Sequence, residues 1–122
     1  MGYPRILVID DEENFLSLVS KVLGKEGYEV RTAVDTTEAL KRLEEEPFDL
    51  ALLDIRMHPI DGLTLLGQIK IRRPHLKVIM VTAYPADQTR TIALLKGAIA
   101  YLVKPLDIND LKETVRGHLL PR

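Results

Sequence analysis

Residues 50–54 read Leu50-Ala51-Leu52-Leu53-Asp54, an apolar run that ends on a carboxylate. Similar short runs occur at residues 6–9, 28–31, 78–81 and 100–103. Runs such as Ile-Leu-Val-Ile and Val-Ile-Met-Val are apolar at consecutive positions, which is typical of parallel strands whose two faces are both covered by helices. The sequence therefore predicts five strands, of which residues 50–53 form the third.

The segments between these runs have helical periodicity. The first segment places Phe15, Leu18, Val19 and Val22 on one helix face. Comparable stripes lie at residues 39–43, 63–70, 87–96 and 108–115. Strands and helices that alternate at this length indicate right-handed crossovers. We therefore predict a single-domain, doubly wound α/β fold in which five helices cover a five-stranded parallel sheet.

Helix ends also have sequence signals. Asp61 and Asp107 are expected to begin helices, because an aspartate side chain bonds to the free N–H groups of a first turn. Gly24 or Gly27 is expected to end the first helix, and Gly97 the fourth. The fourth predicted helix has the least favourable helix propensity, since threonines, which are poor helix formers, precede its apolar part.

The composition restricts the class of protein. At 122 residues the chain has the size of one domain, which we expect to span residues 1–122, and 46% of its residues are hydrophobic. No apolar run is long enough to span a bilayer. The acids from Asp10 onward also interrupt the first apolar run, which is too short for the apolar stretch of a signal peptide. We therefore expect a cytoplasmic protein without membrane contact. The net charge of -1 predicts no direct nucleic-acid binding, and the absence of cysteine excludes thiolate catalysis.

Carboxylates follow two of the predicted strands. Asp10 and Asp11 come directly after residues 6–9, and Asp54 comes directly after residues 50–53. The carboxyl ends of parallel strands form the ligand-binding edge of an open sheet, so we expect these three side chains to lie together. Their mutual repulsion requires a cation, and a ligand set made of oxygen atoms favours Mg²⁺.

A hydroxyl and an ammonium follow two further strands. Thr82 comes after residues 78–81, and Lys104 comes after residues 100–103. Taken alone, each site residue has a simpler interpretation. Asp10 or Asp11 could be a turn residue, Thr82 a hydroxyl bonded to local backbone, and Lys104 a solvated charge. Together at the ends of four strands they favour phosphoryl transfer, which needs a carboxylate nucleophile, a metal ion, a lysine and a hydroxyl.

In order and spacing these residues resemble the receiver domains of two-component response regulators. The resemblance spans the whole chain and rests on Asp10-Asp11, Asp54, Thr82-Ala83, Gly97-Ala98, Tyr101 and Lys104-Pro105. It implies the flavodoxin-like strand order 2-1-3-4-5 and a signalling switch that accepts a phosphoryl group with Mg²⁺ as cofactor. Such a chain is not a turnover enzyme, because it catalyses its own phosphoryl transfer and autodephosphorylation.

The resemblance also implies a role for each site residue. Asp54 is expected to accept the phosphoryl group with the help of Lys104 and Thr82, and Thr82 and Tyr101 are expected to act as switch residues. The implied Mg²⁺ ligands are Asp11 and Asp54 directly, Asp10 through a water molecule, and Arg56 through its backbone carbonyl. The Lys104-Pro105 peptide bond is expected to be cis.

The partners implied by the resemblance are a sensor histidine kinase or a phosphotransfer protein, with a small phosphodonor as another source of the phosphoryl group. Phosphorylation is expected to change the surface of the fourth helix, fifth strand and fifth helix, where a phosphorylation-dependent homodimer or another partner would bind. Ile99 is apolar at a position that is commonly exposed in the family. We therefore expect Ile99 to add contact surface there.

Two positions depart from the family pattern. Pro59 stands one place later than the proline that usually follows the third strand, and Leu106 stands where phenylalanine is common. Proline restricts its own φ and the residue before it. The sequence therefore leaves open the shape of the loop at residues 55–61.

Other functions fit the residues less well. The alternative that we retain is a receiver module that binds proteins without being phosphorylated. A dehalogenase-like phosphohydrolase needs Asp-x-Asp, whereas Asp10 and Asp11 are adjacent. A flavodoxin-like cofactor binder needs a phosphate loop rich in Gly, Ser or Thr, where this chain has four acids. Ser17 and Ser20 lie within the predicted first helix, which argues against a triad hydrolase.

Overall fold

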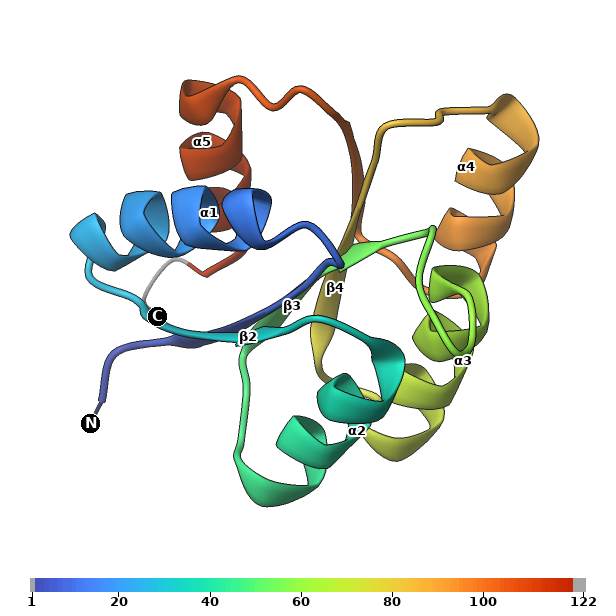
Figure 1. Cartoon of the computed structure of the whole chain (residues 1–122), viewed down its shortest axis with the longest axis horizontal. Coiled ribbons are helices and arrows are strands. Elements are labelled where there is room, and N and C mark those ends of the chain that lie inside the picture. The colour runs from blue at the N-terminus through green and yellow to red at the C-terminus, as the bar shows by residue number, and fades with distance from the viewer. Residues whose placement is uncertain (1, 120–122) are drawn as a thin grey trace.

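The computed structural model describes residues 2–119, in which five strands and five helices alternate along the chain (Figure 1). The strands are β1 (Arg5–Ile9), β2 (Glu29–Ala33), β3 (Leu50–Asp54), β4 (Lys77–Thr82) and β5 (Ala100–Val103). The helices are α1 (Glu13–Lys25), α2 (Thr36–Glu45), α3 (Gly62–Arg72), α4 (Asp87–Leu95) and α5 (Ile108–His118). Within residues 2–119, none of the helices has the length and apolar character that crossing a membrane requires.

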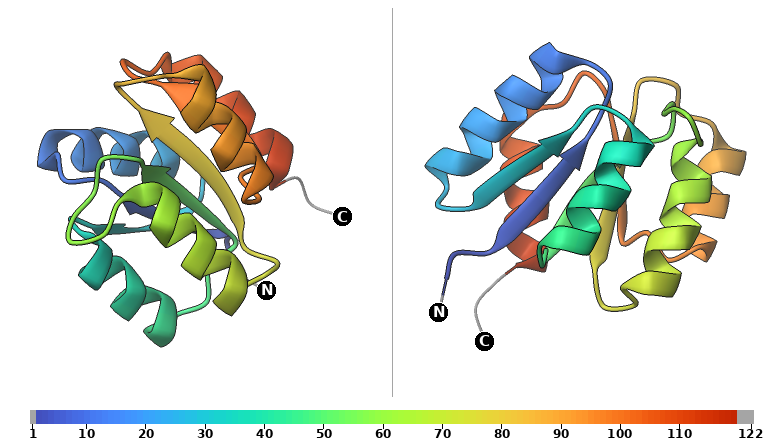
Figure 2. Two further views of the ribbon diagram at one scale, coloured as in Figure 1. Left: turned by 90° about the vertical axis from the view of Figure 1, so that its right-hand side faces the viewer. Right: turned by 60° about the horizontal axis from the view of Figure 1, so that its bottom comes forward.

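The strands form one parallel sheet in the order β2-β1-β3-β4-β5. Helices α1 and α5 cover one face, and α2, α3 and α4 cover the other (Figures 1 and 2). The predicted α/β class and strand order are confirmed. Because the direction of winding reverses between β1 and β3, their carboxyl ends lie side by side at the point where such folds bind ligands.

The sheet buries apolar side chains on both faces. Successive strand residues point to opposite sides, so Ile6 and Val8 pack toward α1 and α5, whereas Leu7 and Ile9 pack toward the other helices. All five residues of β3 are buried, which explains its continuous apolar run. Each large apolar side chain buried in this way contributes roughly 1.5–3 kcal/mol to stability.

Strand ends differ from the prediction by one or two residues. Asp54 and Thr82 are the last residues of β3 and β4, although we expected each to follow its strand. Backbone pairing continues past the apolar run, as between Asp54 and Val81, because ladder hydrogen bonds do not require an apolar side chain. Strand β2 begins and ends later than the predicted residues 28–31, since this half-buried edge strand mixes polar and apolar residues.

Side-chain caps begin α3 and α5 as predicted. Asp61 accepts a hydrogen bond from the Thr64 N–H at 2.9 Å, and Asp107 accepts one from the Asp110 N–H at 3.0 Å. The bond from Thr64 holds the pKa of Asp61 below its usual range. After the carboxyl ends of α1 and α4, Gly27 and Gly97 have φ angles of 97° and 108°. These angles lie in the left-handed region, which disfavours residues that carry a Cβ.

Two peptide bonds that precede proline are cis. The Lys104-Pro105 bond is cis as predicted. The His58-Pro59 bond is also cis, and it lies in the loop at residues 55–61 whose shape the sequence left open.

Ile99, which we expected to add contact surface, is only partly exposed. Ile99 is half-buried against the core beneath α1 and α5, because its N–H bonds to the Val78 oxygen at 2.9 Å and draws the residue toward the sheet. Exposed apolar side chains in this region belong instead to α4 and β5, and include Ile92, Leu94, Leu95 and Val103.

Gly62 begins α3 directly against β3. A Cβ at this position would lie 2.1 Å from the backbone oxygen of Asp54, so we expect Gly62→Ala to lower the free energy of unfolding by about 1–3 kcal/mol or more. In the matched variant Gly67→Ala on the same helix, the nearest atom is Lys96 Nζ at 3.7 Å. Because alanine is a better helix former than glycine, Gly67→Ala should therefore raise the free energy of unfolding by about 0.5–1 kcal/mol. Urea denaturation measures both changes, and equal stability of the two variants would contradict the predicted clash.

Candidate functional site

Three predicted carboxylates meet at the carboxyl edge of β1 and β3. One carboxylate oxygen from each of Asp10, Asp11 and Asp54 lies within 4.8 Å of the others. Asp10 and Asp54 are buried, whereas Asp11 is exposed. The meeting follows from the sheet register, which pairs Ile9 of β1 with Leu53 of β3 immediately before the acids.

Lys104 lies against this acidic cluster. Its ammonium donates to Asp10 Oδ2 at 2.6 Å, to Glu12 Oε1 at 3.1 Å and to Asp54 Oδ2 at 3.2 Å. Its side chain is 9% exposed, and its backbone N–H bonds to the Thr82 oxygen at 2.8 Å, which continues the pairing of β4 and β5. A charge with so little contact with water is retained because opposite charges and hydrogen bonds surround it.

Burial and charge act differently on the two partners of the ion pair. Burial raises the pKa of Asp10 to about 6, although hydrogen bonds from Lys104 and from the Glu12 N–H act in the opposite direction. Burial by itself would lower the pKa of Lys104, but hydrogen bonds to Asp10 and Glu12 and the charge of Asp54 raise it above its ordinary value. The cluster therefore stabilises the ammonium, while Asp10 remains a costly buried anion that a further cation would stabilise.

Thr82 and Tyr101 lie on neighbouring strands. Thr82 is buried at the end of β4, and its hydroxyl accepts a hydrogen bond from the Tyr84 N–H at 3.1 Å. Tyr101 is half-buried on β5, with its phenolic oxygen 3.1 Å from Thr89 Oγ1. The register pairs Tyr101 with Met80, two residues before Thr82, so Thr82 and Tyr101 project from the same face of the sheet.

Two side chains from the start of α1 contribute to the site without having been predicted. Glu12 is the third acid that contacts Lys104, and the Phe15 ring lies beneath the ammonium with its centroid 4.3 Å away. The sequence signal for Glu12 was its place in the acidic run after the first strand. Phe15 was predicted as a helix-face residue, and nothing local distinguishes its contact with a lysine 89 positions away.

Arg56 and Tyr84 join two loops beside the site. The guanidinium of Arg56 stacks on the Tyr84 ring at 3.8 Å from its centroid. The Arg56 N–H donates to Asp54 Oδ1 at 3.1 Å, which places this residue next to the carboxylate. The stacking had no sequence signal, because it connects the loop after β3 with the loop after β4.

The donor set fits a hard divalent cation. The converging ligand atoms are carboxylate oxygens of Asp10, Asp11 and Asp54, without histidine or cysteine. Mg²⁺ binds through a few carboxylates and keeps several water molecules, which exposed Asp11 leaves room for. With Glu12 included, the acids carry more negative charge than the Lys104 ammonium neutralises.

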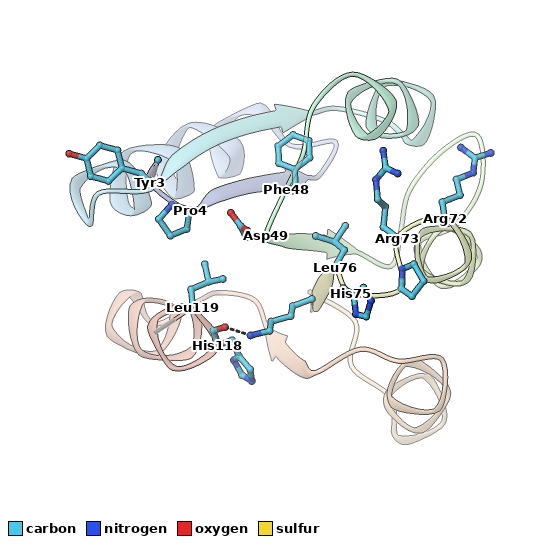
Figure 3. A pocket seen from close by; sticks show the side chains of 13 residues that line it. Tyr3, Pro4, Phe48, Asp49, Arg72, Arg73, His75, Leu76, His118 and Leu119 are labelled. Carbon is cyan, nitrogen blue, oxygen red and sulfur yellow. Dashed lines mark hydrogen bonds between the residues drawn. The ribbon is translucent and has the colours of Figure 1, made fainter. Parts of the chain in front are cut away.

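Two hollows border different ends of the sheet. A pocket of about 590 Å³ lies at the amino-terminal end of the strands, where Asp49, Leu76 and His118 line it, and it shares no residue with the acidic cluster (Figure 3). A groove of about 370 Å³ runs beside Lys104 between α1 and α5. Its lining is mostly apolar and includes Phe15, Leu18, Leu106 and Leu111.

Comparison with known families agrees with this geometry. The family model for the response regulator receiver domain matches residues 6–116. The chain therefore belongs to the response regulator receiver domain family of two-component signalling systems.

Curated relatives include longer regulatory proteins. The chain is 39% identical over 114 residues to the transcriptional regulatory protein ZraR of Escherichia coli K12, and 38% identical over 115 residues to the response regulator protein PilR of Pseudomonas aeruginosa. These matches cover 93% and 94% of this chain but 26% of each relative. The chain thus spans about a quarter of the length of these relatives.

Solved receiver structures have the same fold. A CheY-like receiver domain protein from Methanospirillum hungatei is 38% identical, with a TM-score of 0.92 over 95% of this chain and 93% of that one. The response regulator TrrA from Thermotoga maritima, solved in complex with Mg²⁺-BeF, is 39% identical, with a TM-score of 0.86 over 95% of this chain and 99% of that one.

Asp10 should make the metal-free protein less stable as the pH rises. Because folding raises its pKa to about 6, its contribution to stability is complete at low pH and is lost as the pH passes about 6. We expect Asp10→Asn in EDTA to raise the free energy of unfolding by about 1–3 kcal/mol at about pH 7.5, and the gain to shrink toward about pH 4. Urea denaturation over this pH range measures the difference, and Asp110→Asn, at an exposed position of α5, is the control. Lower stability of Asp10→Asn at the higher pH would mean that its ion pair outweighs its burial.

Proposed function

We propose that this receiver domain is a phosphorylation-dependent signalling switch whose phosphoryl acceptor is Asp54. One observation carries the proposal: the buried Asp54 carboxylate converges with Asp10 and Asp11 and accepts a hydrogen bond from Lys104. A phosphoryl group on Asp54 would have cationic groups beside the oxygens that carry its charge. Electrostatic stabilisation of this kind is the main requirement of phosphoryl transfer.

The transfer proceeds by direct displacement. An oxygen of Asp54 attacks the donor's phosphorus atom, and the bond from phosphorus to the donor's nitrogen or oxygen breaks with its electron pair leaving on the donor. Lys104 then pairs with one phosphoryl oxygen, and the Thr82 hydroxyl donates to another. Autodephosphorylation follows when water attacks phosphorus, which releases inorganic phosphate and restores the carboxylate.

The residues that would hold Mg²⁺ are Asp11 and Asp54 as direct ligands, Asp10 through a water molecule and the Arg56 backbone carbonyl. When bound there, Mg²⁺ supplies positive charge that neutralises phosphoryl oxygens. The convergence of the three carboxylates and the likeness to TrrA, solved with Mg²⁺-BeF, support this ligand set.

The donor is a sensor histidine kinase or phosphotransfer protein in the cytoplasm, and a small phosphodonor also serves the chemistry. The apolar groove between α1 and α5 supports a protein donor, because it borders Lys104. A phosphohistidine domain seated in the groove would present its phosphoryl group at the site. Leu18, which is 49% exposed at this groove, would be covered by that contact.

Phosphorylation is coupled to the surface through Thr82 and Tyr101. The Thr82 hydroxyl accepts a hydrogen bond from the Tyr84 N–H and keeps its own hydrogen for a phosphoryl oxygen, so a shift of the hydroxyl toward the phosphoryl group would draw the loop after β4 with it. The space behind Thr82 becomes available to the Tyr101 ring, which projects from the same face of the sheet. Two packed arrangements are then alternatives, and a swing from 1:99 to 99:1 needs about 5.5 kcal/mol of differential binding.

The responding surface is made by α4, β5 and α5, and we assign it to a phosphorylation-dependent homodimer. Exposed Ile92, Leu94, Leu95 and Val103 give this surface its apolar character. Helix α4 is the element expected to move, since its N-cap residue Ala86 makes no side-chain cap hydrogen bond.

Phosphorylation of Asp54 is tested by intact-mass analysis after incubation with acetyl phosphate and Mg²⁺. We expect the wild-type chain to gain one phosphoryl group, Asp54→Asn to gain none, and the control Asp110→Asn to match the wild type. Omitting Mg²⁺ should abolish the gain. Labelling of Asp54→Asn at the wild-type rate would identify another acceptor, and an unlabelled wild-type chain would favour the phosphorylation-independent binding module.

The dimer surface is tested with beryllofluoride and Mg²⁺ as a phosphoryl mimic. We expect self-association in sedimentation and altered amide exchange over residues 83–101. Leu95→Glu should abolish the association because it places a charge on the apolar surface, whereas Ile71→Glu on α3 should not. The two positions are matched, because Leu95 is 83% exposed and Ile71 is 82% exposed. Unchanged association and unchanged exchange in the wild-type chain would contradict the proposed response.

A further inference from the structure

The loop at residues 55–61 passes directly beside the acidic cluster as it joins β3 to α3. A hydrogen bond from the Gly62 N–H to the Ile55 oxygen at 2.7 Å draws its two ends together. Near its start, the Arg56 N–H donates to Asp54 Oδ1 at 3.1 Å. Its tip contains Pro59, which has no N–H to donate, and the residues on either side of Pro59 bond to a side chain from another element.

Thr36, the first residue of α2, supplies these partners. Its hydroxyl donates to the His58 carbonyl at 2.9 Å and accepts a hydrogen bond from the Ile60 N–H at 3.2 Å. Its backbone N–H donates to the same His58 carbonyl at 2.7 Å. The hydroxyl therefore uses both its donor and its acceptor capacity on the two residues that flank Pro59.

We propose that Thr36 is a positioning residue for the phosphorylation site, because it holds the loop in the shape that Mg²⁺ binding at Asp54 and Arg56 requires. The inference rests on the function proposed above. Arg56 precedes His58 by two residues in a loop whose base is closed, so a displaced tip shifts Arg56. The hydrogen bond from the Arg56 N–H transmits that shift to the Asp54 carboxylate.

The hydroxyl is the part of Thr36 that matters for this role. Any residue other than proline can supply the backbone N–H at this position, but the bond from Ile60 needs a side-chain oxygen at the threonine position. Thr36 is 1% exposed, so water does not readily replace that oxygen. Its removal leaves the Ile60 N–H without its partner, which disfavours the observed loop shape.

The experiment compares two substitutions in the full chain. Thr36→Val keeps the branched shape and removes the hydroxyl, and we expect it to weaken Mg²⁺ binding in calorimetry by about tenfold, the scale seen for groups that orient metal ligands. It should also speed amide exchange at residues 56–60 in the metal-free protein. Thr36→Ser keeps the hydroxyl and should match the wild type in both measurements. Thr36→Ala serves as a second variant without the hydroxyl if the valine variant fails to fold.

Labelling by acetyl phosphate gives an independent readout. Thr36→Val should be labelled more slowly than the wild type at low Mg²⁺ and at nearly the wild-type rate when Mg²⁺ is saturating. Equal Mg²⁺ affinity in the wild-type and hydroxyl-free chains would overturn the positioning role, even if the variants were less stable in urea. A wild-type chain that neither binds Mg²⁺ nor accepts a phosphoryl group would instead overturn the proposed function, and this role with it.

Discussion

The contact of the Lys104 ammonium with three acids is the interaction on which the rest of the site depends. Lys104 comes from the end of β5, while Asp10 follows β1 and Asp54 ends β3, so three strands must reach the same edge in register. A buried carboxylate without such a partner costs several kcal/mol. The acids nevertheless exceed the ammonium in charge, and this excess is what makes the edge suited to a metal ion.

The backbone around Asp54 is constrained more strongly than the backbone around Thr82. Beside Asp54, Gly62 lets α3 approach the strand closely, and Thr36 bonds to the loop that follows it. Within residues 2–119 the Thr82 hydroxyl has one hydrogen bond, from the Tyr84 N–H, and the helix that follows begins without a side-chain cap. A rigid backbone at Asp54, where we propose that the metal ion binds, next to a less constrained backbone at Thr82 suits a signalling switch. Segments with few hydrogen bonds open at the lowest free energy.

Much of the fold and of the candidate site could be predicted from local sequence. Continuous apolar runs reveal buried parallel strands, and helical stripes between them imply the crossovers that form the sheet. Once the strands are known, Asp10, Asp54, Thr82 and Lys104 must share an edge, because the carboxyl ends of parallel strands point the same way. The same logic does not extend to strand ends, where backbone pairing carried Asp54 and Thr82 into their strands.

By itself, then, the sequence determined the fold class, the strand order through family resemblance, and the convergence of Asp10, Asp11 and Asp54 with Lys104. The tertiary structure alone decided the contacts between segments far apart in the chain. Thr36 bonds to a residue 22 positions away, Arg56 stacks on Tyr84 across two loops, and Ile99 turns toward the core. The physical reason is that periodicity and propensity describe neighbours within a few residues, whereas these contacts depend on how helices and loops pack around the finished sheet.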